Sequence, residues 1–505
     1  MVIHILELSG RSLSLEQIAQ VSAGGPELSL SGEARSRVQA ARELVEQLVR
    51  ENKVCYGVNT GFGKLSDVHI PASDLEALQL NLVRSHACGL GNPLSEAETR
   101  AMMLLRANVL ACGISGCRPV LIETLLNMLQ RGVHPVIPEK GSVGASGDLA
   151  PLAHLALSML GEGESFFRGA RLSGAEALLL ANIAPVRLAA KEGLSLLNGT
   201  QAMAAVGGLA LLRAERVTAL ADLAGAMTLE AVLGTPVAFD ARIQQARPHP
   251  QQSAVAAHLR ELLADSEIRQ SHLTGDTRVQ DAYSLRCMPQ VHGAVRTALR
   301  HAREVVEIES GSATDNPLVF TDTGEILSGG NFHGAPLAMV FDYAAIALAD
   351  LMSIGERRID RLINPDLNEG LPPFLSPRPG ISSGFMLVHV VAAALLNEAK
   401  VLAHPASVDS VPTSGGKEDH VSMGMTSALK LRQIVDNAEF AVAIELMVAA
   451  EGLRYRLPLQ SSKPIRRAIE IVRGFAPPLA ADRALSKDIQ ALAQAIKAGE
   501  LDEFV

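Results

Sequence analysis

A run of small residues, Gly141 to Gly147, could do chemistry on its own backbone. The apolar stretch that follows predicts a helix with Asp148 as its cap. In Ala145-Ser146-Gly147, the Gly147 nitrogen has no side chain beside it, so it could attack the Ala145 carbonyl and close a five-membered ring. Loss of the Ser146 hydroxyl as water would then leave a methylidene group, which is an electrophile.

Two other interpretations of this run remain open on the residues alone. It could be an ordinary tight turn that enters a buried helix. It could also cradle a phosphate, because backbone N–H groups ahead of a helix attract anions. Neither a Lys-Ser nor a Lys-Thr pair closes the run, and no apolar strand leads into it, as nucleotide-binding loops require. A non-catalytic anion-binding protein is therefore an alternative.

The stretch from Gly141 to His154 resembles the signature of the aromatic amino-acid ammonia-lyase family, in which an Ala-Ser-Gly tripeptide becomes a methylidene-imidazolone (MIO) group. The resemblance implies that Ala145, Ser146 and Gly147 form this group by autocatalytic cyclisation, with no external cofactor. An electrophile suits the removal of an amino group, since general acid–base catalysis typically supplies only ~10²–10⁴-fold.

Further motifs of the family supply catalytic residues. Cys55 to Gly63 resembles the family's Tyr-Gly-x-Asn-Thr-Gly-Phe-Gly element, which implies that Tyr56 is the base for the β-proton. An unperturbed tyrosine has a pKa of about 10, so this role needs a site that favours the phenolate. The same resemblance implies catalytic roles for Tyr283 and for Glu418, whose carboxylate would contact the substrate ring or assist proton transfer.

Ser85-His86 occupies the place where the family discriminates substrates: Ser-His goes with histidine, His-Leu with tyrosine and Phe-Leu with phenylalanine. The resemblance thus implies release of ammonia from L-histidine to leave trans-urocanate, a step of histidine degradation. A lyase or aminomutase acting on tyrosine or phenylalanine is the alternative. The substrate-binding residues that the resemblance implies are His86, Asn198, Gln280, Arg286 and Phe332.

Three positions depart from the family pattern. Ala282 replaces the usual Pro, Met288 stands where Gln is often found, and Gly415-Gly416-Lys417 replaces Ala-Asn-Gln. We expect altered loop stiffness at the first two and altered hydrogen bonding at the third.

The composition favours packed helices. Hydrophobic residues make up 48% of the 505, aromatic residues 3%, and there is no Trp, so the interior must be built from Ala, Leu, Val, Ile and Met. The predicted fold is mainly α, with an N-terminal mixed region (1–198) that carries the active-site loop and a few short strands, and a long-helix bundle with C-terminal helices (199–505). The family resemblance also implies a homotetramer whose sites draw residues from several subunits.

The charge pattern and the cysteines limit which partners and which cellular compartment we expect. The net charge of −9 has no long single-sign run, so we expect no nucleic-acid partner. The opening residues lack a secretory pattern, and the apolar runs are interrupted before they could span a bilayer, which predicts no membrane association. Five cysteines without a Cys-x-x-Cys pair indicate a reducing, cytoplasmic location. The scattered histidines predict no metal site.

The elements that position these motifs follow from apolar periodicity and start and stop signals. We expect a strand and loop in Val54–Gly63, capping boxes at Ser73 and Ser95, and loose structure from Gly161 to Arg187. A hairpin is predicted in Leu318–Leu327. The predicted helices are Glu33–Lys53, Pro119–Gly132, Thr200–Leu233, Pro289–Ser310, Pro336–Ile363, Gly384–Leu402 and Asp419–Leu453, with two more near Ile465 and Leu485.

Overall fold

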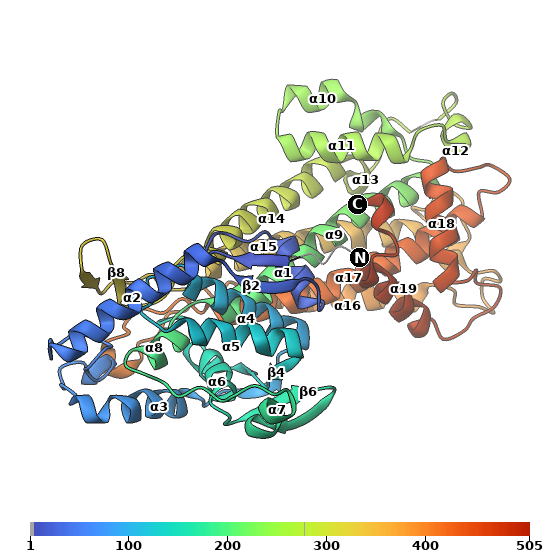
Figure 1. Ribbon diagram of the computed structural model, residues 1–505. Helices are drawn as coiled ribbons and strands as arrows, with labels where there is room; N and C mark the ends of the chain where they lie inside the picture. The colour runs from blue at the N-terminus through green and yellow to red at the C-terminus, as the bar shows by residue number, and fades with distance from the viewer. Residues whose placement is uncertain (1–4, 277) are drawn as a thin grey trace. The chain divides into compact units, whose positions relative to one another are not determined.

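The computed structural model describes residues 5–276 and 278–505. Helices hold 59% and strands 8% of the protein, which confirms the mainly helical prediction (Figure 1). Contacts divide the chain into two compact units: unit 1 comprises Met1–Leu209, Ala302–Asp342 and Pro405–Leu429, and unit 2 comprises Ala210–His301, Tyr343–His404 and Lys430–Val505. The domain boundary at residues 198/199 remains a prediction.

Most helices lie within one unit. Those of unit 1 are α1 (Leu15–Ser22), α2 (Gly32–Arg50), α3 (Leu75–His86), α4 (Glu96–Ala111), α5 (Pro119–Arg131), α6 (Leu149–Met159), α7 (Gly174–Leu180) and α8 (Glu192–Leu197). Those of unit 2 are α10 (Ala241–Ala246), α11 (Pro250–Leu262), α12 (Glu267–Gln270), α13 (Tyr283–Arg286), α16 (Met386–Leu402), α18 (Lys463–Phe475) and α19 (Ser486–Ala498).

The longest helices contribute residues to both units. They are α9 (Gln201–Ala231), α14 (Met288–Ser310), α15 (Ala335–Ile363) and α17 (Gly424–Arg454). Their bounds agree with the predicted runs to within two residues, except that α17 begins five residues after the predicted Asp419. The residues before Gly424 instead form a loop that carries Glu418.

Among the described residues, the strands are short and lie only in unit 1. They are β1 (Ile5–Leu8) paired in parallel with β2 (Glu27–Leu30), β3 (Leu90–Pro93) antiparallel to β5 (Pro138–Lys140), the antiparallel sheet β4 (Val133–Pro135), β6 (Glu164–Phe167), β7 (Ala170–Ser173), and the hairpin β8 (Leu318–Phe320), β9 (Glu325–Leu327). The hairpin prediction is confirmed.

Two predictions about irregular segments are wrong. Gly161–Arg187 is not loose, because β6, β7 and α7 lie in it; the two-residue turn Arg168-Gly169, with both residues at positive φ, joins the strands. Val54–Gly63 contains no strand, only an isolated bridge from Thr60 to His69. Backbone hydrogen bonds of turns and the side chain of Asn59 together hold that segment, as described below.

Helix α15 corrects the expectation that every apolar run is interrupted too early to span a bilayer. By length and composition it could cross a membrane, but 72% of its most apolar window is buried within the protein. Burial of this kind is typical of a core helix, so the helix packs inside the fold.

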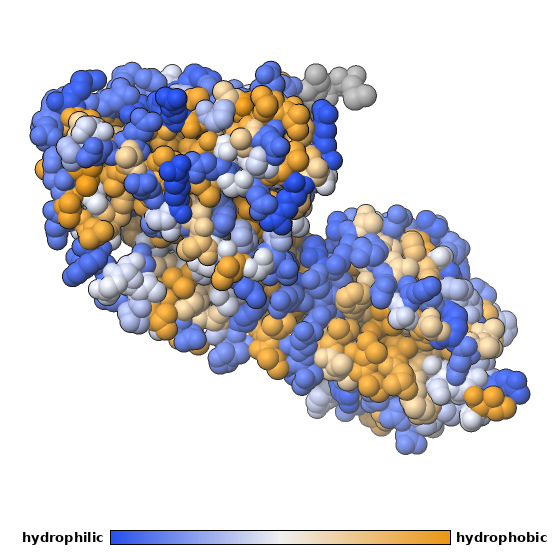
Figure 2. All heavy atoms as spheres, turned by 90° about the horizontal axis from the view of Figure 1, so that it is seen from below, coloured by the Kyte–Doolittle hydropathy of each residue, from blue (hydrophilic) through white to orange (hydrophobic). Residues whose placement is uncertain are grey.

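Large apolar side chains also reach the surface in patches (Figure 2). One row follows α16 in unit 2, where Leu387, Val390, Val391 and Val401 are all exposed. A row of this kind on a helix is typical of a surface that another protein chain covers.

The two predicted capping boxes differ in outcome. Ser95 forms one with Glu98 at the start of α4, as predicted. Ser73 forms none, because a 3₁₀ turn precedes α3 and Asp74 takes the N-cap position without a side-chain bond. We expect Ser95→Ala to lower the free energy of unfolding by about 1 kcal/mol. Urea denaturation measures this, and Ser73→Ala is the control, with an expected change within about 0.5 kcal/mol; equal losses would contradict this account.

Candidate active site

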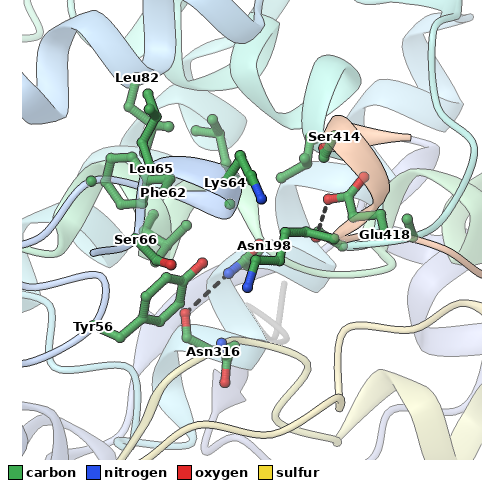
Figure 3. A pocket seen from close by; sticks show the side chains of 18 of the residues that line it. Tyr56, Phe62, Lys64, Leu65, Ser66, Leu82, Asn198, Asn316, Ser414 and Glu418 are labelled. Atoms are coloured by element: carbon green, nitrogen blue, oxygen red, sulfur yellow. Dashed lines mark hydrogen bonds between the residues drawn. The ribbon is translucent and has the colours of Figure 1, made fainter. Parts of the chain in front are cut away.

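A cavity of about 1050 Å³ lies within unit 1 (Figure 3). It brings together seven residues that the sequence predicted for the site, from segments far apart in the chain. They are Tyr56, His86, Ala145, Ser146, Asn198, Phe332 and Glu418. Gly147, although not in the lining, directly follows Ser146 in the same loop.

The backbone around the tripeptide leaves no room for larger residues. Gly147 has φ +75°, and a Cβ there would lie 2.1 Å from the Gly199 carbonyl oxygen. Gly144 has φ +68°, and a Cβ there would lie 2.2 Å from the Ser422 Oγ. Only glycine fits these positions. Ala145, Ser146 and Gly147 therefore sit in a compressed loop, which fits a tripeptide that closes into a ring.

Two other segments hold this loop in place. The Ser422 Oγ donates to the Gly144 carbonyl at 2.9 Å, and the Gly334 N–H donates to the same oxygen at 3.2 Å. The Met423 N–H donates to the Val143 carbonyl at 2.8 Å. The loop is thus fixed from the Phe332 side and from the Glu418 side of the cavity.

Asp148 does not cap α6 with its side chain, contrary to the sequence prediction, although it occupies the N-cap position. Its buried carboxylate accepts the Ser142 hydroxyl at 2.7 Å and the Met203 N–H at 2.8 Å. Met203 lies in the first turn of α9, whose N–H groups have no partner within the helix. Asp148 therefore caps α9, and burial raises its pKa to about 6.

Side chains build the turn that presents Tyr56. The Asn59 Oδ1 accepts the Cys55 N–H at 2.8 Å, while the Asn59 Nδ2 donates to the Lys53 carbonyl at 2.9 Å. Figure 3 shows the Tyr56 ring with its hydroxyl directed into the cavity, toward Asn198. The Asn59 side chain thus stabilises the turn that places the Tyr56 phenol in the cavity.

The surroundings of Tyr56 do not by themselves favour its phenolate. Burial raises the pKa of Tyr56 above its ordinary value, and the negative charge of Glu418 adds to that shift. A backbone hydrogen bond at Gly63 opposes it only in part. A base at this position therefore needs a further positive group.

His86 presents a hydrogen-bond acceptor to the cavity. Its Nδ1 lies 2.8 Å from the Leu82 carbonyl oxygen. Because a carbonyl oxygen only accepts, the Nδ1 carries the hydrogen in this contact. The Nε2 of the neutral ring is then an acceptor, at the last residue of α3.

Glu418 presents a second acceptor. Its Oε1 accepts the Ser146 hydroxyl at 2.8 Å, and its Oε2 accepts the Thr413 hydroxyl at 2.7 Å. With His86 in the same lining, the cavity can bind a ring that carries N–H donors, which a phenyl ring lacks.

Asn198 lies at the C-cap of α8 and is only 3% exposed. Its Nδ2 donates to the Asn316 carbonyl at 3.0 Å (Figure 3), and its own carbonyl accepts from Arg106 at 2.5 Å. Arg106 is fully buried in α4, which lowers its pKa to about 10. Phe332 is half-buried and joins the lining from the loop before α15.

Three predicted site residues are not brought to the cavity. Gln280, Tyr283 and Arg286 belong to unit 2 and are absent from the lining. Tyr283 is 71% exposed, with the Arg286 guanidinium 4.6 Å from its ring centroid. The Arg286 Nε is buried without a hydrogen-bond partner.

The departures from the family pattern also have places in the structure. Ala282 is the N-cap of α13. Met288 is buried in unit 2, where its Sδ would lie 2.3 Å from a Cβ at Gly225, so it is a packing residue. Lys417 lines the cavity beside Glu418.

Sequence reasoning missed several lining residues. Asn316 is one, although a polar Thr-Asp-Asn-Pro run before the hairpin could have indicated it. His333 and His420 are others, and their rings stack with centroids 5.7 Å apart. Within residues 5–276 and 278–505, no group of three or more His, Cys, Asp or Glu could hold a metal ion.

Comparison with known proteins adds independent information. Residues 13–474 match the family described as aromatic amino acid lyase. A histidine ammonia-lyase of Anaeromyxobacter sp. (strain K) is 56% identical over 505 residues, covering 98% of this chain and 99% of that protein. The crystal structure of histidine ammonia-lyase from Trypanosoma cruzi has a TM-score of 0.92 at 41% identity, covering 99% of this chain and 95% of that one. The crystal structure of tyrosine aminomutase from Streptomyces globisporus has a TM-score of 0.94 at 37% identity, covering 99% of this chain and 98% of that one.

Proposed function

The chain belongs to the aromatic amino acid lyase family, and from this we propose that it releases ammonia from L-histidine and leaves trans-urocanate. The observation that carries the proposal is the convergence of Ser146, His86 and Glu418 in one cavity. The full-length similarity to a histidine ammonia-lyase supports it. The experiment is to mix the purified protein with histidine, tyrosine or phenylalanine and follow the ultraviolet absorbance of the unsaturated acid.

His86 and Glu418 orient the substrate by its ring. The His86 Nε2 and the Glu418 carboxylate are both acceptors, so together they suit an imidazole that carries one or two N–H groups. Fixing the ring at one end of the cavity places the α and β carbons near the tripeptide, which lowers the entropy cost of reaction.

Tyr56 takes the β-proton, and the amino nitrogen leaves from the α carbon, so that a carbon–carbon double bond forms between them. When formed from Ala145-Ser146-Gly147, the MIO group supplies an electron-poor centre that helps the nitrogen to leave. The compressed backbone at Gly144 and Gly147 supports its formation.

Asn198 and Phe332 flank the tripeptide. The Asn198 Nδ2 has one hydrogen on the Asn316 carbonyl and a second that remains for a ligand in the cavity. Phe332 adds apolar surface to the lining, which excludes water from the reacting atoms.

Further copies of the chain complete the site, in a homotetramer. Gln280, Tyr283 and Arg286 are absent from the cavity of their own chain, and Tyr283 is largely exposed. The exposed row on α16 gives such copies an apolar surface to cover. Arg286 would then bind the substrate carboxylate through its two-pronged guanidinium.

We place this enzyme in the cytoplasm as a soluble protein. All five cysteines are free, and Cys88 is exposed, which suits a reducing compartment. Neither a membrane nor a nucleic acid is needed for the activity.

Substrate choice can be tested at His86. We expect His86→Phe to lower kcat/KM for histidine, because an N–H of the substrate ring loses its acceptor. A lost partner of this kind costs about 1–3 kcal/mol, or roughly 5- to 150-fold in kcat/KM. Activity on phenylalanine should rise at the same time. Ser66→Ala serves as the control, because Ser66 also lines the cavity, whereas the Ser85 Oγ lies 3.0 Å from the His86 Nδ1 and is part of the same pair. Unchanged selectivity in His86→Phe would contradict the role of His86 in substrate choice.

A further inference from the structure

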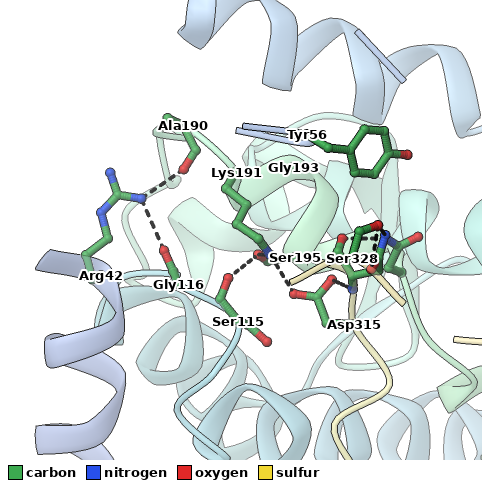
Figure 4. Close-up of polar contacts among 12 residues, drawn as sticks. Arg42, Tyr56, Ser115, Gly116, Ala190, Lys191, Gly193, Ser195, Asp315 and Ser328 are labelled. Atoms are coloured by element: carbon green, nitrogen blue, oxygen red, sulfur yellow. Dashed lines mark hydrogen bonds and ion pairs between the residues drawn. The ribbon is translucent and has the colours of Figure 1, made fainter. Parts of the chain in front are cut away.

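A buried ion pair lies in unit 1, outside the lining of the cavity. The Lys191 Nζ is 2.9 Å from the Asp315 Oδ2, and both side chains are 0% exposed. The Nζ also donates to the Ser195 Oγ at 3.2 Å (Figure 4). Neither charged residue contacts the space where a substrate would bind, since neither lines the cavity.

The pair is connected to Asn198 by two hydrogen bonds. The second carboxylate oxygen of Asp315, Oδ1, accepts the Asn316 N–H at 2.7 Å. The Asn316 carbonyl in turn accepts the Asn198 Nδ2 at 3.0 Å. The Asn316 side chain is held as well, because its Oδ1 accepts the Gly329 N–H at 2.7 Å.

These contacts fix the residues at both ends of α8. Lys191 is its N-cap, in the left-handed conformation at φ +68°, and Asn198 is its C-cap. Two consecutive residues, Asp315 and Asn316, therefore hold the N-cap and the C-cap residue of the same short helix. Any shift of Asp315 must move the partner of the Asn198 carboxamide.

Stability alone does not explain why two charges are buried here. Taking both ions out of water is costly, and apolar residues of similar volume are often as stabilising or more so. What the ion pair adds is direction, because the carboxylate must face the ammonium with one oxygen and the Asn316 N–H with the other.

We propose that the Lys191–Asp315 pair is a positioning element that orients the Asn198 carboxamide toward Ala145-Ser146-Gly147. This inference rests on the proposed function, in which Asn198 acts at the tripeptide. Arg106 complements the pair, since it holds the backbone carbonyl of Asn198 while the pair sets its side chain. Loss of the pair impairs both the cyclisation of the tripeptide and the turnover that follows.

The test removes the pair as a unit with Lys191→Met/Asp315→Leu, so that no unpaired charge stays buried. The matched control is Arg358→Met/Glu445→Leu, which removes a buried pair of unit 2 that does not line the cavity. Intact-protein mass reports the fraction of chains that have lost two waters, and steady-state kinetics with histidine separate kcat from KM. Urea denaturation reports the stability of each variant.

We expect the Lys191→Met/Asp315→Leu variant to retain part of its chains at the heavier mass and to lose about tenfold or more in kcat, with KM within about threefold. The control should lose both waters completely and keep kcat within about threefold of the unaltered chain. This should hold even if its free energy of unfolding falls as much as that of the Lys191→Met/Asp315→Leu variant. A variant at 191 and 315 that matches the control in mass and in kcat overturns the inference.

Asp315→Glu keeps both charges of the pair, so it tests the inference even if the Lys191→Met/Asp315→Leu variant does not fold. Its longer side chain displaces the acceptor of the Asn316 N–H, so we expect kcat to fall about fivefold or more at unchanged stability. An unchanged kcat in Asp315→Glu also overturns the inference. If the unaltered chain shows neither the mass loss nor deamination, the proposed function fails and the inference with it.

Discussion

Ser146→Ala is expected to abolish ammonia release from histidine. Without the Ser146 hydroxyl no water can leave from the side chain, so no methylidene group forms. We expect kcat to fall by about 10³-fold or more, which corresponds to ~4 kcal/mol of lost transition-state stabilisation. The change also removes the hydrogen bond that the Ser146 Oγ donates to Glu418 at 2.8 Å, but the smaller side chain causes no clash, so the fold should tolerate it.

Intact-protein mass and a urocanate assay measure this result together. The unaltered chain should be lighter than its sequence by two waters, and the Ser146→Ala chain should lack the loss that comes from the side chain. Ser66→Ala is the control for mass, since Ser66 also lines the cavity but lies outside the tripeptide. A Ser146→Ala protein with undiminished deamination would contradict an electrophile built from this loop.

Tyr56→Phe should lower kcat by ~10²–10⁴-fold, the usual contribution of a positioned base. The change removes only the hydroxyl that points into the cavity, so the mass loss at the tripeptide should remain complete. Burial and Glu418 both raise the pKa of Tyr56, so a base here must gain a positive group in the assembled site. Arg286 of another copy is a candidate for that group.

Steady-state kinetics with histidine and intact mass on the same preparation test the role of Tyr56. Tyr343→Phe on α15 is the matched control, because that side chain is 46% exposed and does not line the cavity. Full activity in Tyr56→Phe, together with loss of activity in Tyr283→Phe, would assign the base to Tyr283 instead.

The long helices could be predicted because their apolar residues recur with helical spacing over many turns. The Ser95 capping box and the Leu318–Leu327 hairpin have equally local signals. The wrong predictions at Ser73 and in Gly161–Arg187 concern features that have no such local signal. A 3₁₀ turn displaces the start of α3 from Ser73, and the strands β6 and β7 are too short to show an alternating pattern.

Part of the candidate site could likewise be predicted from the sequence, and part could not. Motifs that resemble the family's were sufficient to select Tyr56, His86, Ser146 and Glu418, and the cavity unites them. The sequence could not predict the contacts between residues far apart in the chain. Asp148 caps a helix that begins more than fifty residues later, and the Lys191–Asp315 pair joins positions 124 apart.

Gln280, Tyr283 and Arg286 illustrate a third kind of prediction. The family resemblance selects them, yet one chain alone does not bring them to its cavity. We propose that assembly with further copies places them, and no local pattern in a single sequence encodes such a contact. Tyr283 is largely exposed and the buried Arg286 Nε has no hydrogen-bond partner, and both observations fit the proposed contact with another copy.

The most direct test of the account is the mass of the proteolytic peptide that contains Gly141 to His154, taken from protein that deaminates histidine. We predict a peptide lighter than its sequence by two waters, with the loss confined to Ala145-Ser146-Gly147. A peptide of unaltered mass from fully active protein would contradict the central claim that this tripeptide becomes the electrophile.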